Sequence, residues 1–544
     1  MKSTSYWLVF AFASAACFIV SGVPLITIAW QLIGEGAKLI EGTVVPGFDE
    51  RQAALLANSV RIAGGAAVLS MVLGGASGVA LQVLRVPSRG LLLWLLPIPF
   101  LIPPYIQALA WMEILGKSGL LARAVDTVFA GQIAIPSLYS PAGAIWVTAL
   151  AYFPIVAVTT VLGARGLDAR YEEAAVLARG PRAALYRIQL PMLAPAIFTG
   201  GLIVFLLSVV GFSVPSLLQQ SVYPVEIHTQ FAAFYDIGAG LWGAVPLLGV
   251  GGIATLAWHL YMRRRRGWYS GHAKPAGDSR ATRPLRIAAA ALCWVLVGTS
   301  TVLPLAVLAF RSLPLSSFAR AWDTAHEELL TSVIIASIAA CVITGLAFLL
   351  AYFSRLRLAT PFFSAVTLSP LLLSGPALGI ALILAWNHAG WRSAVYDSIA
   401  IVVLASCARY LFFGFAAVAT ASRRLDPALF EAASVSGIPW HRQMSGILLP
   451  LTLPALVGVW GLSFVLCFGE VDAAVLVTPP GATTLPVRIF GLLHYGPSSL
   501  VAALSLLVVL IELAGAGLAV AAYALAIRNV RPRLRIRHAR PSLG

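Results

Sequence analysis

Few residues in this sequence have the types and spacing that chemistry needs. Gly116-Lys117-Ser118 matches the end of a phosphate-binding loop, but that loop needs a glycine five positions before its Gly-Lys pair, where this chain has Trp111. The five cysteines are far apart and form no CxxC pair, so they indicate neither a disulfide framework nor a metal centre. Three histidines are equally scattered: His228, His388 and His494. We predict no catalytic residue and no metal site.

Four ionisable side chains stand in otherwise apolar surroundings: Arg409, Glu470, Asp472 and Glu512. A charge at the centre of a bilayer costs about 2.5 to 3.5 kcal/mol on insertion scales, so each is a candidate for function. Glu470 and Asp472 could line a polar path or respond to a gate, or they could reach water at the outer end of a span. Arg409 could pair with Glu512, either as a structural ion pair or as part of a path.

A cluster of prolines points to a further polar position. Four prolines between Pro97 and Pro104 interrupt one apolar stretch just before Tyr105 and Gln107. A helix broken inside a membrane frees backbone carbonyls, which protein or a water-filled cavity must then satisfy. The pattern predicts a broken helix with Tyr105 and Gln107 on a polar path, and simple kinking by proline is the alternative.

The composition identifies the elements that must position these residues. Hydrophobic residues make up 59% of the 544 positions and charged residues 11%, and the mean hydropathy is +0.89. Soluble domains carry roughly 25% charged residues, and disordered chains have low hydrophobicity, so both classes are excluded. We predict an all-α, polytopic membrane protein.

A membrane-spanning helix needs about 20 apolar residues. About twelve stretches meet this length: Trp7–Ile33, Ile62–Leu84, Leu91–Leu115, Ala142–Leu162, Ile197–Leu218, Leu241–Met262, Ile287–Phe310, Ser332–Phe353, Pro361–Trp386, Ser398–Ala421, Ala455–Val477 and Leu500–Ile527. The first is longer than the roughly 7 to 15 apolar residues of a cleaved signal peptide, so we interpret it as a span.

The basic residues predict an orientation. Most of the 37 lysines and arginines fall in alternate loops and in the tails, notably between Arg263 and Arg286 and between Arg528 and Arg540. Cytoplasmic loops carry such an excess, so both termini are predicted to be cytoplasmic. The net charge of +16 could also indicate nucleic-acid binding, but that function needs basic residues gathered on one face among aromatic side chains. Their spread over short loops argues against a nucleic-acid partner.

An internal repeat divides the chain. Two segments recur: Leu55–Val68 as Leu329–Val342, and Glu172–Ile197 as Phe430–Leu456. The first alignment places Ser59 opposite Ser332. Equivalent points are six predicted spans apart, and an even number of spans restores the orientation, so the halves are parallel repeats. We predict a first six-span half at 1–262, a basic cytoplasmic linker at 263–286, and a second six-span half with a basic tail at 287–544.

The second repeated segment carries the same pattern twice. Each copy reads Glu-Ala-Ala, then a glycine, then Ile-x-Leu-Pro, on the predicted cytoplasmic side between the fourth and fifth spans of its half. The pattern predicts a helix, a turn in which glycine supplies a positive φ, and a new helix that begins at the proline. It resembles the EAA loop of the membrane subunits of bacterial ATP-binding cassette (ABC) importers. The resemblance assigns these residues to ATPase coupling: Glu173, Ala174, Ala175, Gly180, Pro191, Glu431, Ala432, Ala433, Gly437 and Pro450.

The first copy departs from the family pattern. Its glycine, Gly180, comes seven residues after Glu173, whereas Gly437 comes six after Glu431, and Pro191 comes one residue early. One residue turns a helix by about 100°, so the first loop is expected to dock with altered geometry.

Further segments narrow the resemblance to fused permeases of the ferric-iron type: Leu96–Trp111, Cys467–Gly496 and the weaker counterpart Val210–Phe231. This implies ferric iron as cargo, with thiamine, polyamine and phosphonate permeases as similar alternatives. It also implies two copies of an ABC ATPase subunit that bind ATP and Mg²⁺, an external solute-binding protein, and a bacterial cytoplasmic membrane. No cofactor is expected on this chain itself. The translocation-path candidates are Glu470, Asp472, Tyr105 and Gln107.

Two other classes compete with this interpretation. A secondary transporter driven by an ion gradient would also use parallel repeats and paired buried carboxylates, but it would transport without any ATPase. A membrane-embedded enzyme would need a dense cluster of His, Asp or Glu at one membrane face, and the sequence indicates none.

Overall fold

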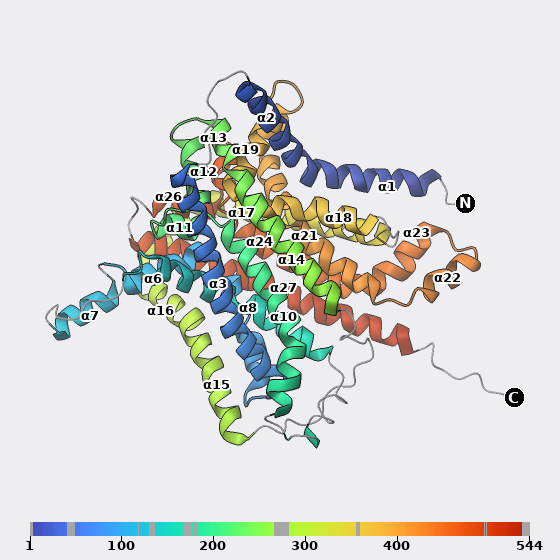
Figure 1. Cartoon of the computed structure of the whole chain (residues 1–544), viewed down its shortest axis with the longest axis horizontal. Coiled ribbons are helices and arrows are strands. Elements are labelled where there is room, and N and C mark those ends of the chain that lie inside the picture. The colour runs from blue at the N-terminus through green and yellow to red at the C-terminus, as the bar shows by residue number, and fades with distance from the viewer. Residues whose placement is uncertain are drawn as a thin grey trace. The chain divides into compact units, whose positions relative to one another are not determined.

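Helices form all the regular secondary structure in the part of the chain that the computed structural model describes (Figure 1). That part comprises residues 4–40, 49–117, 119–129, 137–166, 176–177, 180, 183–265, 282–354, 359–493, 496 and 498–535. Ten helical segments within it are long and apolar enough to cross a membrane, and there are up to twelve spans if two sharply bent helix pairs each count as one. The predicted all-α, polytopic fold is confirmed.

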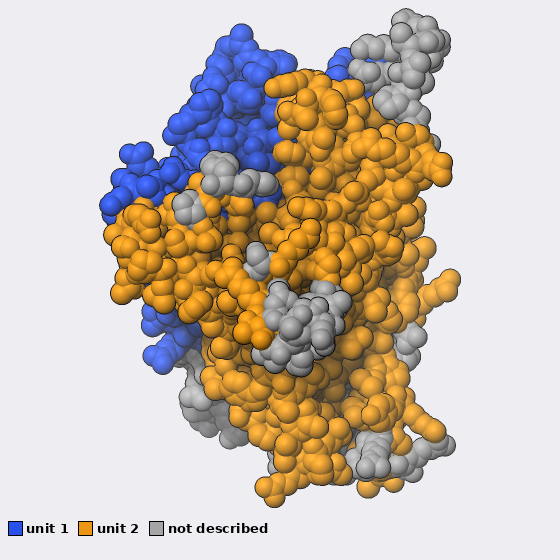
Figure 2. Space-filling view, turned by 90° about the vertical axis from the view of Figure 1, so that its left-hand side faces the viewer, with its two compact units in different colours: residues 1–43, 322–491, 507–544 blue, residues 44–321, 492–506 orange. Residues whose placement is uncertain are grey.

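Contacts between residues group the chain into two units, coloured separately in Figure 2. Unit 1 comprises Met1–Thr43, Trp322–Gly491 and Leu507–Gly544, and unit 2 comprises Val44–Ala321 and Leu492–Leu506. The two predicted halves rest on the sequence repeat and not on contacts, so the boundaries 1–262 and 287–544 stay a prediction. Most of the predicted linker 263–286 lies outside the described residues.

The helices follow in chain order (Figure 1). The first half contains α1 (Thr4–Cys17), α2 (Val23–Ile40), α3 (Glu50–Gln82), α4 (Arg89–Leu95), α5 (Ile98–Leu101), α6 (Pro104–Leu115), α7 (Leu120–Phe129), α8 (Pro141–Arg165), α10 (Leu190–Val209), α11 (Ser213–Leu217), α12 (Tyr223–Ala232), α13 (Ile237–Trp242) and α14 (Ala244–Arg265). The second contains α15 (Arg283–Val297), α16 (Leu303–Arg311), α17 (Ser316–Phe353), α18 (Ala359–Leu368), α19 (Gly375–Trp386), α20 (Ser393–Tyr396), α21 (Ala400–Arg423), α22 (Ala428–Val435), α23 (Trp440–Gln443), α24 (Leu449–Phe468), α25 (Ala474–Val477), α26 (Leu485–Leu492) and α27 (Ser498–Arg535).

Four wide π-helical turns each precede a proline by two residues. The turns are η1 (Phe18–Gly22), η2 (Leu185–Gln189), η4 (Gly298–Val302) and η6 (Met444–Leu448), before Pro24, Pro191, Pro304 and Pro450 respectively. Proline supplies no N–H, and its ring clashes with the carbonyl four residues earlier. A turn with i→i+5 bonds moves that carbonyl aside, so the helix continues through the proline.

These turns correct one prediction from the sequence. Pro450 was expected to begin a helix, but a continuous helical segment runs from Trp440 to Phe468, with Pro450 well inside it. In the same way, the segment Leu185–Val209 carries Pro191 inside it. The fifth and eleventh spans therefore both begin and end earlier than their hydropathy suggested.

The two bent pairs lie at the third span of each half. Arg89–Leu101 and Pro104–Leu115 meet at 92°, which confirms the break that the prolines predicted. Thr360–Leu372 and Gly375–Trp386 meet at 108°, and this second break was not predicted. Proline at 376, one residue into α19, was the available signal, because the residue before a proline is biased away from helix.

Small residues allow the helices of unit 2 to approach closely. Gly74 on α3 faces α8, where an added Cβ would collide with the carbonyl oxygen of Phe153 and lie 2.7 Å from the Cβ of Val156. Gly64, on the same helix, has nothing within 4 Å of such a Cβ. Alanine substitutions at Gly74 and Gly64 therefore distinguish the effect of a steric clash from the effect on helix propensity.

We expect Gly74→Ala to lower the free energy of unfolding by about 1 to 3 kcal/mol, because the backbone of α8 must move to make room. Gly64→Ala should raise it by about 0.5 to 1 kcal/mol, because alanine favours the helix where space is free. Thermal unfolding of the purified variants in detergent measures both. Equal behaviour of the two variants would contradict the packing argument.

Candidate functional site

The second repeated loop forms a helix, a turn and a helix, but the second helix begins at Trp440 and not at Pro450. Gly437 ends α22 with a left-handed φ of 73°. Its N–H bonds to the carbonyl of Ser434 at 3.1 Å, and the N–H of Ile438 bonds to the carbonyl of Ala433 at 2.9 Å. These two bonds around a left-handed residue make a Schellman motif, in which glycine alone avoids the strain of a Cβ.

The helix α22 presents one face outward. Phe430 and Ala433 are buried, whereas Glu431 and Ala432 are exposed and Val435 is 90% exposed. Only one of the two alanines in the motif is therefore open to a partner. Glu431, Ala432 and Val435 are therefore all open to solvent on α22.

One set of contacts fixes α22 to the helix that follows, and another fixes that helix to α1. The side-chain Nε2 of Gln443 donates to the hydroxyl of Ser434 at 3.1 Å and to the carbonyl of Ile438 at 2.8 Å. Trp440 packs edge-on against Tyr6 of α1, with ring centroids 5.7 Å apart. Gln443 thus holds α22 and its turn against the continuous helix that begins at Trp440.

The first loop is described only in part. Glu173, Ala174 and Ala175 lie outside the described residues. Leu177 is 84% exposed, four residues after the glutamate, as Val435 is four residues after Glu431. Gly180 has a left-handed φ of 79° despite its later position. Both loops therefore share an exposed apolar residue and a left-handed glycine.

Unit 1 contains a buried cluster of charged residues. Nη2 of Arg409 on α21 lies 3.0 Å from Oδ2 of Asp472, and its Nε lies 3.3 Å from Oε2 of Glu470. The hydroxyl of Tyr410 donates to Glu470, whose other oxygen accepts the N–H of Ala473 at 2.9 Å. Arg409, Glu470 and Asp472 are at most 8% exposed.

This geometry overturns two expectations. Glu470 and Asp472 do not reach water, because both are buried, and the guanidinium of Arg409 bonds to each of them inside the protein. Arg409 bonds to them and not to Glu512, which is fully buried and whose carboxyl oxygens have no hydrogen-bond partner among the described residues. Removing one partner from a buried ion pair leaves an uncompensated charge, so these three residues depend on one another.

The charged cluster lies against the bend of the ninth span. A Cβ at Gly375, the first residue of α19, would collide with Asp472 and lie 2.7 Å from the backbone nitrogen of Ala473. The buried hydroxyl of Ser374 accepts the N–H of Ala377 at 3.4 Å and caps α19. Motion of this bend would therefore disturb the carboxylates directly.

In unit 2, the polar residues after the broken third span are also buried. Tyr105 is 1% exposed and Gln107 is fully buried on α6. Nε2 of Gln107 donates to the carbonyl of Ser300 at 2.7 Å, four residues before Pro304. The amide thus replaces the N–H that this proline lacks. Whether Tyr105 and Gln107 also line a path stays a prediction.

The histidines do not gather into a site. In the described ranges, no group of three or more His, Cys, Asp or Glu side chains could hold a metal ion. His228 stacks on Phe212 with ring centroids 4.7 Å apart, and burial lowers the pKa of this histidine. It is therefore neutral at pH 7. His494 lies outside the described residues.

Comparison with known proteins decides the family. No family model matches the chain. The chain is 30% identical over 229 residues to the putrescine transport system permease protein PotI of Escherichia coli K12. This alignment covers 38% of the chain and 79% of PotI. The chain belongs to the permeases of binding-protein-dependent ABC transporters.

Two other relatives of this permease are named for different solutes. The chain is 32% identical over 151 residues to the putative 2-aminoethylphosphonate transport system permease protein PhnV of Salmonella paratyphi A. This alignment covers 28% of the chain and 56% of PhnV. The chain thus spans about half the length of that relative. It is 27% identical over 217 residues to the molybdenum transport system permease protein ModB of Mycobacterium tuberculosis, covering 37% of this chain and 78% of ModB.

Each unit has a serine contact with an ion pair nearby, and the signs of the charges are exchanged between units. The charged residue on the span stands at different steps, since Arg51 is eight residues before Ser59 and Glu328 is four before Ser332. In unit 2, Ser59 accepts the N–H of Tyr223 at 2.8 Å, and Arg51 bonds Glu226 at 2.7 Å. In unit 1, the hydroxyl of Ser332 accepts the N–H of Leu485 at 2.8 Å. Glu328 there bonds Arg488, three residues after Leu485, just as Glu226 follows Tyr223 by three. The sequence alignment of Ser59 with Ser332 therefore marked equivalent positions.

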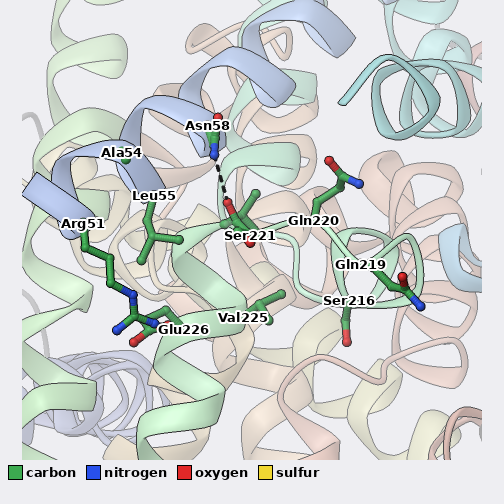
Figure 3. A pocket seen from close by; sticks show the side chains of 11 residues that line it. Arg51, Ala54, Leu55, Asn58, Ser216, Gln219, Gln220, Ser221, Val225 and Glu226 are labelled. Carbon is green, nitrogen blue, oxygen red and sulfur yellow. Dashed lines mark hydrogen bonds and ion pairs between the residues drawn. The ribbon is translucent and has the colours of Figure 1, made fainter. Parts of the chain in front are cut away.

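The first of these arrangements borders a pocket of about 420 Å³ (Figure 3). One wall is a face of α3 with Arg51, Leu55 and Asn58, and the other is the segment from Ser216 to Glu226. Nδ2 of Asn58 donates to the carbonyl of Ser221 at 3.3 Å across the pocket. The sequence analysis missed this pocket, because its walls are more than 150 residues apart and share no motif.

Proposed function

We propose that this permease is the transmembrane subunit of an ATP-driven ABC importer. Two copies of an ATPase subunit would dock on the loops at Glu173 and Glu431, and an external binding protein would deliver a solute for transport into the cytoplasm. The proposal places the chain in a bacterial cytoplasmic membrane with both termini inside. The observation that carries it is the pair of loops that each combine an exposed apolar side chain with a left-handed glycine.

Coupling would run from these loops into the bundle. Closure of the ATPase dimer around ATP would pull on α22, and Gln443 would pass the displacement to the helix Trp440–Phe468. ATP would then shift the population between inward- and outward-open states, because the closed dimer fits one state better. The charged cluster beyond the end of that helix would sense its motion at the bend beside Gly375.

The docking surface can be tested directly. We expect Val435→Glu to abolish co-purification with the ATPase, because a second carboxylate beside Glu431 would replace an apolar contact. Val435→Leu keeps the apolar surface and should keep binding. Leu177→Glu makes the same change in the first loop. Unchanged co-purification and ATP-driven uptake in both glutamate variants would contradict the proposal, and uptake driven by an ion gradient without any ATPase would favour a secondary transporter.

The cargo is a separate part of the proposal. The sequence resemblance favours ferric iron, while the relatives found by comparison are named for aminoethylphosphonate, putrescine and molybdenum. ATPase activity of the reconstituted complex, measured with its binding protein and each solute in turn, distinguishes them. If ferric ion gives no stimulation while thiamine, a polyamine or a phosphonate does, iron is the wrong cargo.

A further inference from the structure

Arginines from four helix ends gather at one end of unit 2. Arg85 lies in the turn between α3 and α4, Arg89 begins α4, Arg165 ends α8, and Arg286 lies in the first turn of α15. Nη2 of Arg286 donates to the backbone carbonyl of Arg85 at 2.6 Å. The positive charges of Arg85 and Arg165 act on the guanidinium of Arg89. We call these four residues the arginine cluster.

Two members of the arginine cluster retain donors that no described residue satisfies. Nη2 of Arg89 donates to the neutral amide of Gln82 at 2.7 Å. The Nε atoms of Arg89 and Arg286 are shielded from solvent and have no hydrogen-bond partner among the residues that the structure describes. Like charges repel, and a buried donor without an acceptor costs free energy, so this arrangement calls for an anion.

The surroundings place the arginine cluster at the depth of lipid headgroups. Its members lie at or beside the ends of four candidate spans, which end at Gln82 and Arg165 or begin at Arg89 and Arg283. Exposed apolar side chains flank it: Leu91, Trp94, Leu162 and Ile287. Tryptophan is enriched where acyl chains meet headgroups. A ligand here would have an apolar part beside those side chains and an anionic part at the guanidinium groups.

The backbone between α3 and α4 supports a functional role. Arg85 has a φ of 50° and Ser88 a φ of 61°, both left-handed and neither glycine. Such conformations cost free energy and persist where surrounding structure enforces them, often at ligand sites. Here they turn the chain so that Arg85 and Arg89 join the arginine cluster.

We propose that the arginine cluster binds the phosphate of an anionic phospholipid headgroup. Guanidinium groups suit phosphate because their planar N–H donors match its oxygens in pairs. The same chemistry would accept free phosphate, and the exposed apolar side chains favour the lipid as its source. This inference does not depend on the cargo or on ATP coupling.

The test compares lipid retention by the full permease. The protein is purified into nanodiscs of phosphatidylcholine with phosphatidylglycerol, released into the gas phase, and its bound lipids are identified by native mass spectrometry. We expect Arg89→Gln/Arg286→Gln to retain phosphatidylglycerol about tenfold less, as the loss of charge-assisted bonds implies. Arg89→Lys/Arg286→Lys keeps both charges and should retain more. Arg423→Gln/Arg424→Gln removes two arginines at another span end and should retain as much as the original chain.

Three results would overturn the proposal. Equal phosphatidylglycerol retention by the Arg89→Gln/Arg286→Gln variant and the original chain would show that the arginine cluster does not bind this lipid. An equal loss in the Arg423→Gln/Arg424→Gln control would reduce the effect to overall charge. Complete displacement of the lipid by inorganic phosphate would assign the site to free phosphate. Size-exclusion chromatography and an unchanged amount of bound phosphatidylcholine confirm that each variant is folded.

Discussion

Valine at position 437 is expected to abolish ATP-driven uptake while the permease still accumulates in the membrane. Gly437 has a φ of 73°, and no atom lies within 4 Å of an added Cβ. A side chain at this position is therefore disfavoured by the backbone conformation and not by a steric clash with neighbouring residues. A left-handed conformation costs an L-residue about 1 to 2 kcal/mol, and a β-branched residue is among the least tolerant. The turn should reopen and displace α22.

Asparagine provides the matched control, because it tolerates the left-handed conformation far better than valine does. Gly437→Asn should therefore retain most of the uptake. Uptake into proteoliposomes that contain the ATPase, with membrane content checked by immunoblot, measures both variants. If Gly437→Val transports normally, or if the two variants fail to the same extent, the turn geometry is not what couples the loop to the motor.

The second large effect is expected at Arg409. Arg409→Met leaves the buried carboxylates of Glu470 and Asp472 without their cation, and breaking a buried pair in this way typically costs about 3 to 5 kcal/mol. The unfolding temperature in detergent should fall accordingly. Transport should be lost as well, because the bend at Gly375 packs against these carboxylates.

Neutralising the whole cluster is the informative control. The triple variant Arg409→Met/Glu470→Gln/Asp472→Asn removes the charges together and should recover most of the stability, since no unpaired charge remains buried. If it then transports, the cluster serves stability; if it is stable but inactive, the charges take part in gating. A single Arg409→Met variant as stable as the original chain would contradict the observed pairing.

Features that depend on a short stretch of sequence could be predicted. Glu431, Gly437 and their neighbours form a motif within twenty residues, so the loop and its left-handed glycine could be foreseen. The break before Tyr105 followed from four nearby prolines. Both features depend on backbone chemistry that a short segment determines by itself.

Features that depend on distant partners could not be predicted in the same way. Arg409 lies 63 residues from Asp472, and hydropathy gave no reason to prefer that carboxylate over Glu512. A place for Gln107 on a polar path stays a prediction, and nothing near it in the sequence indicated that its amide bonds a carbonyl 193 residues away. Pro370 and Pro376 flank the break at Gly375 and could have indicated it, whereas the close approach of Asp472 to Gly375 is visible only in three dimensions.

The exchanged ion pairs have a consequence for engineering. Arg51 pairs with Glu226 in one repeat, and Glu328 pairs with Arg488 in the other, at the same step after a shared Pro-Val dipeptide. A chimaera that grafts α12 in place of α26 would oppose two glutamates, and the reverse graft would oppose two arginines. Each of α12 and α26 is therefore interchangeable only together with the long helix it contacts, so the natural unit for recombination is the pair of helices.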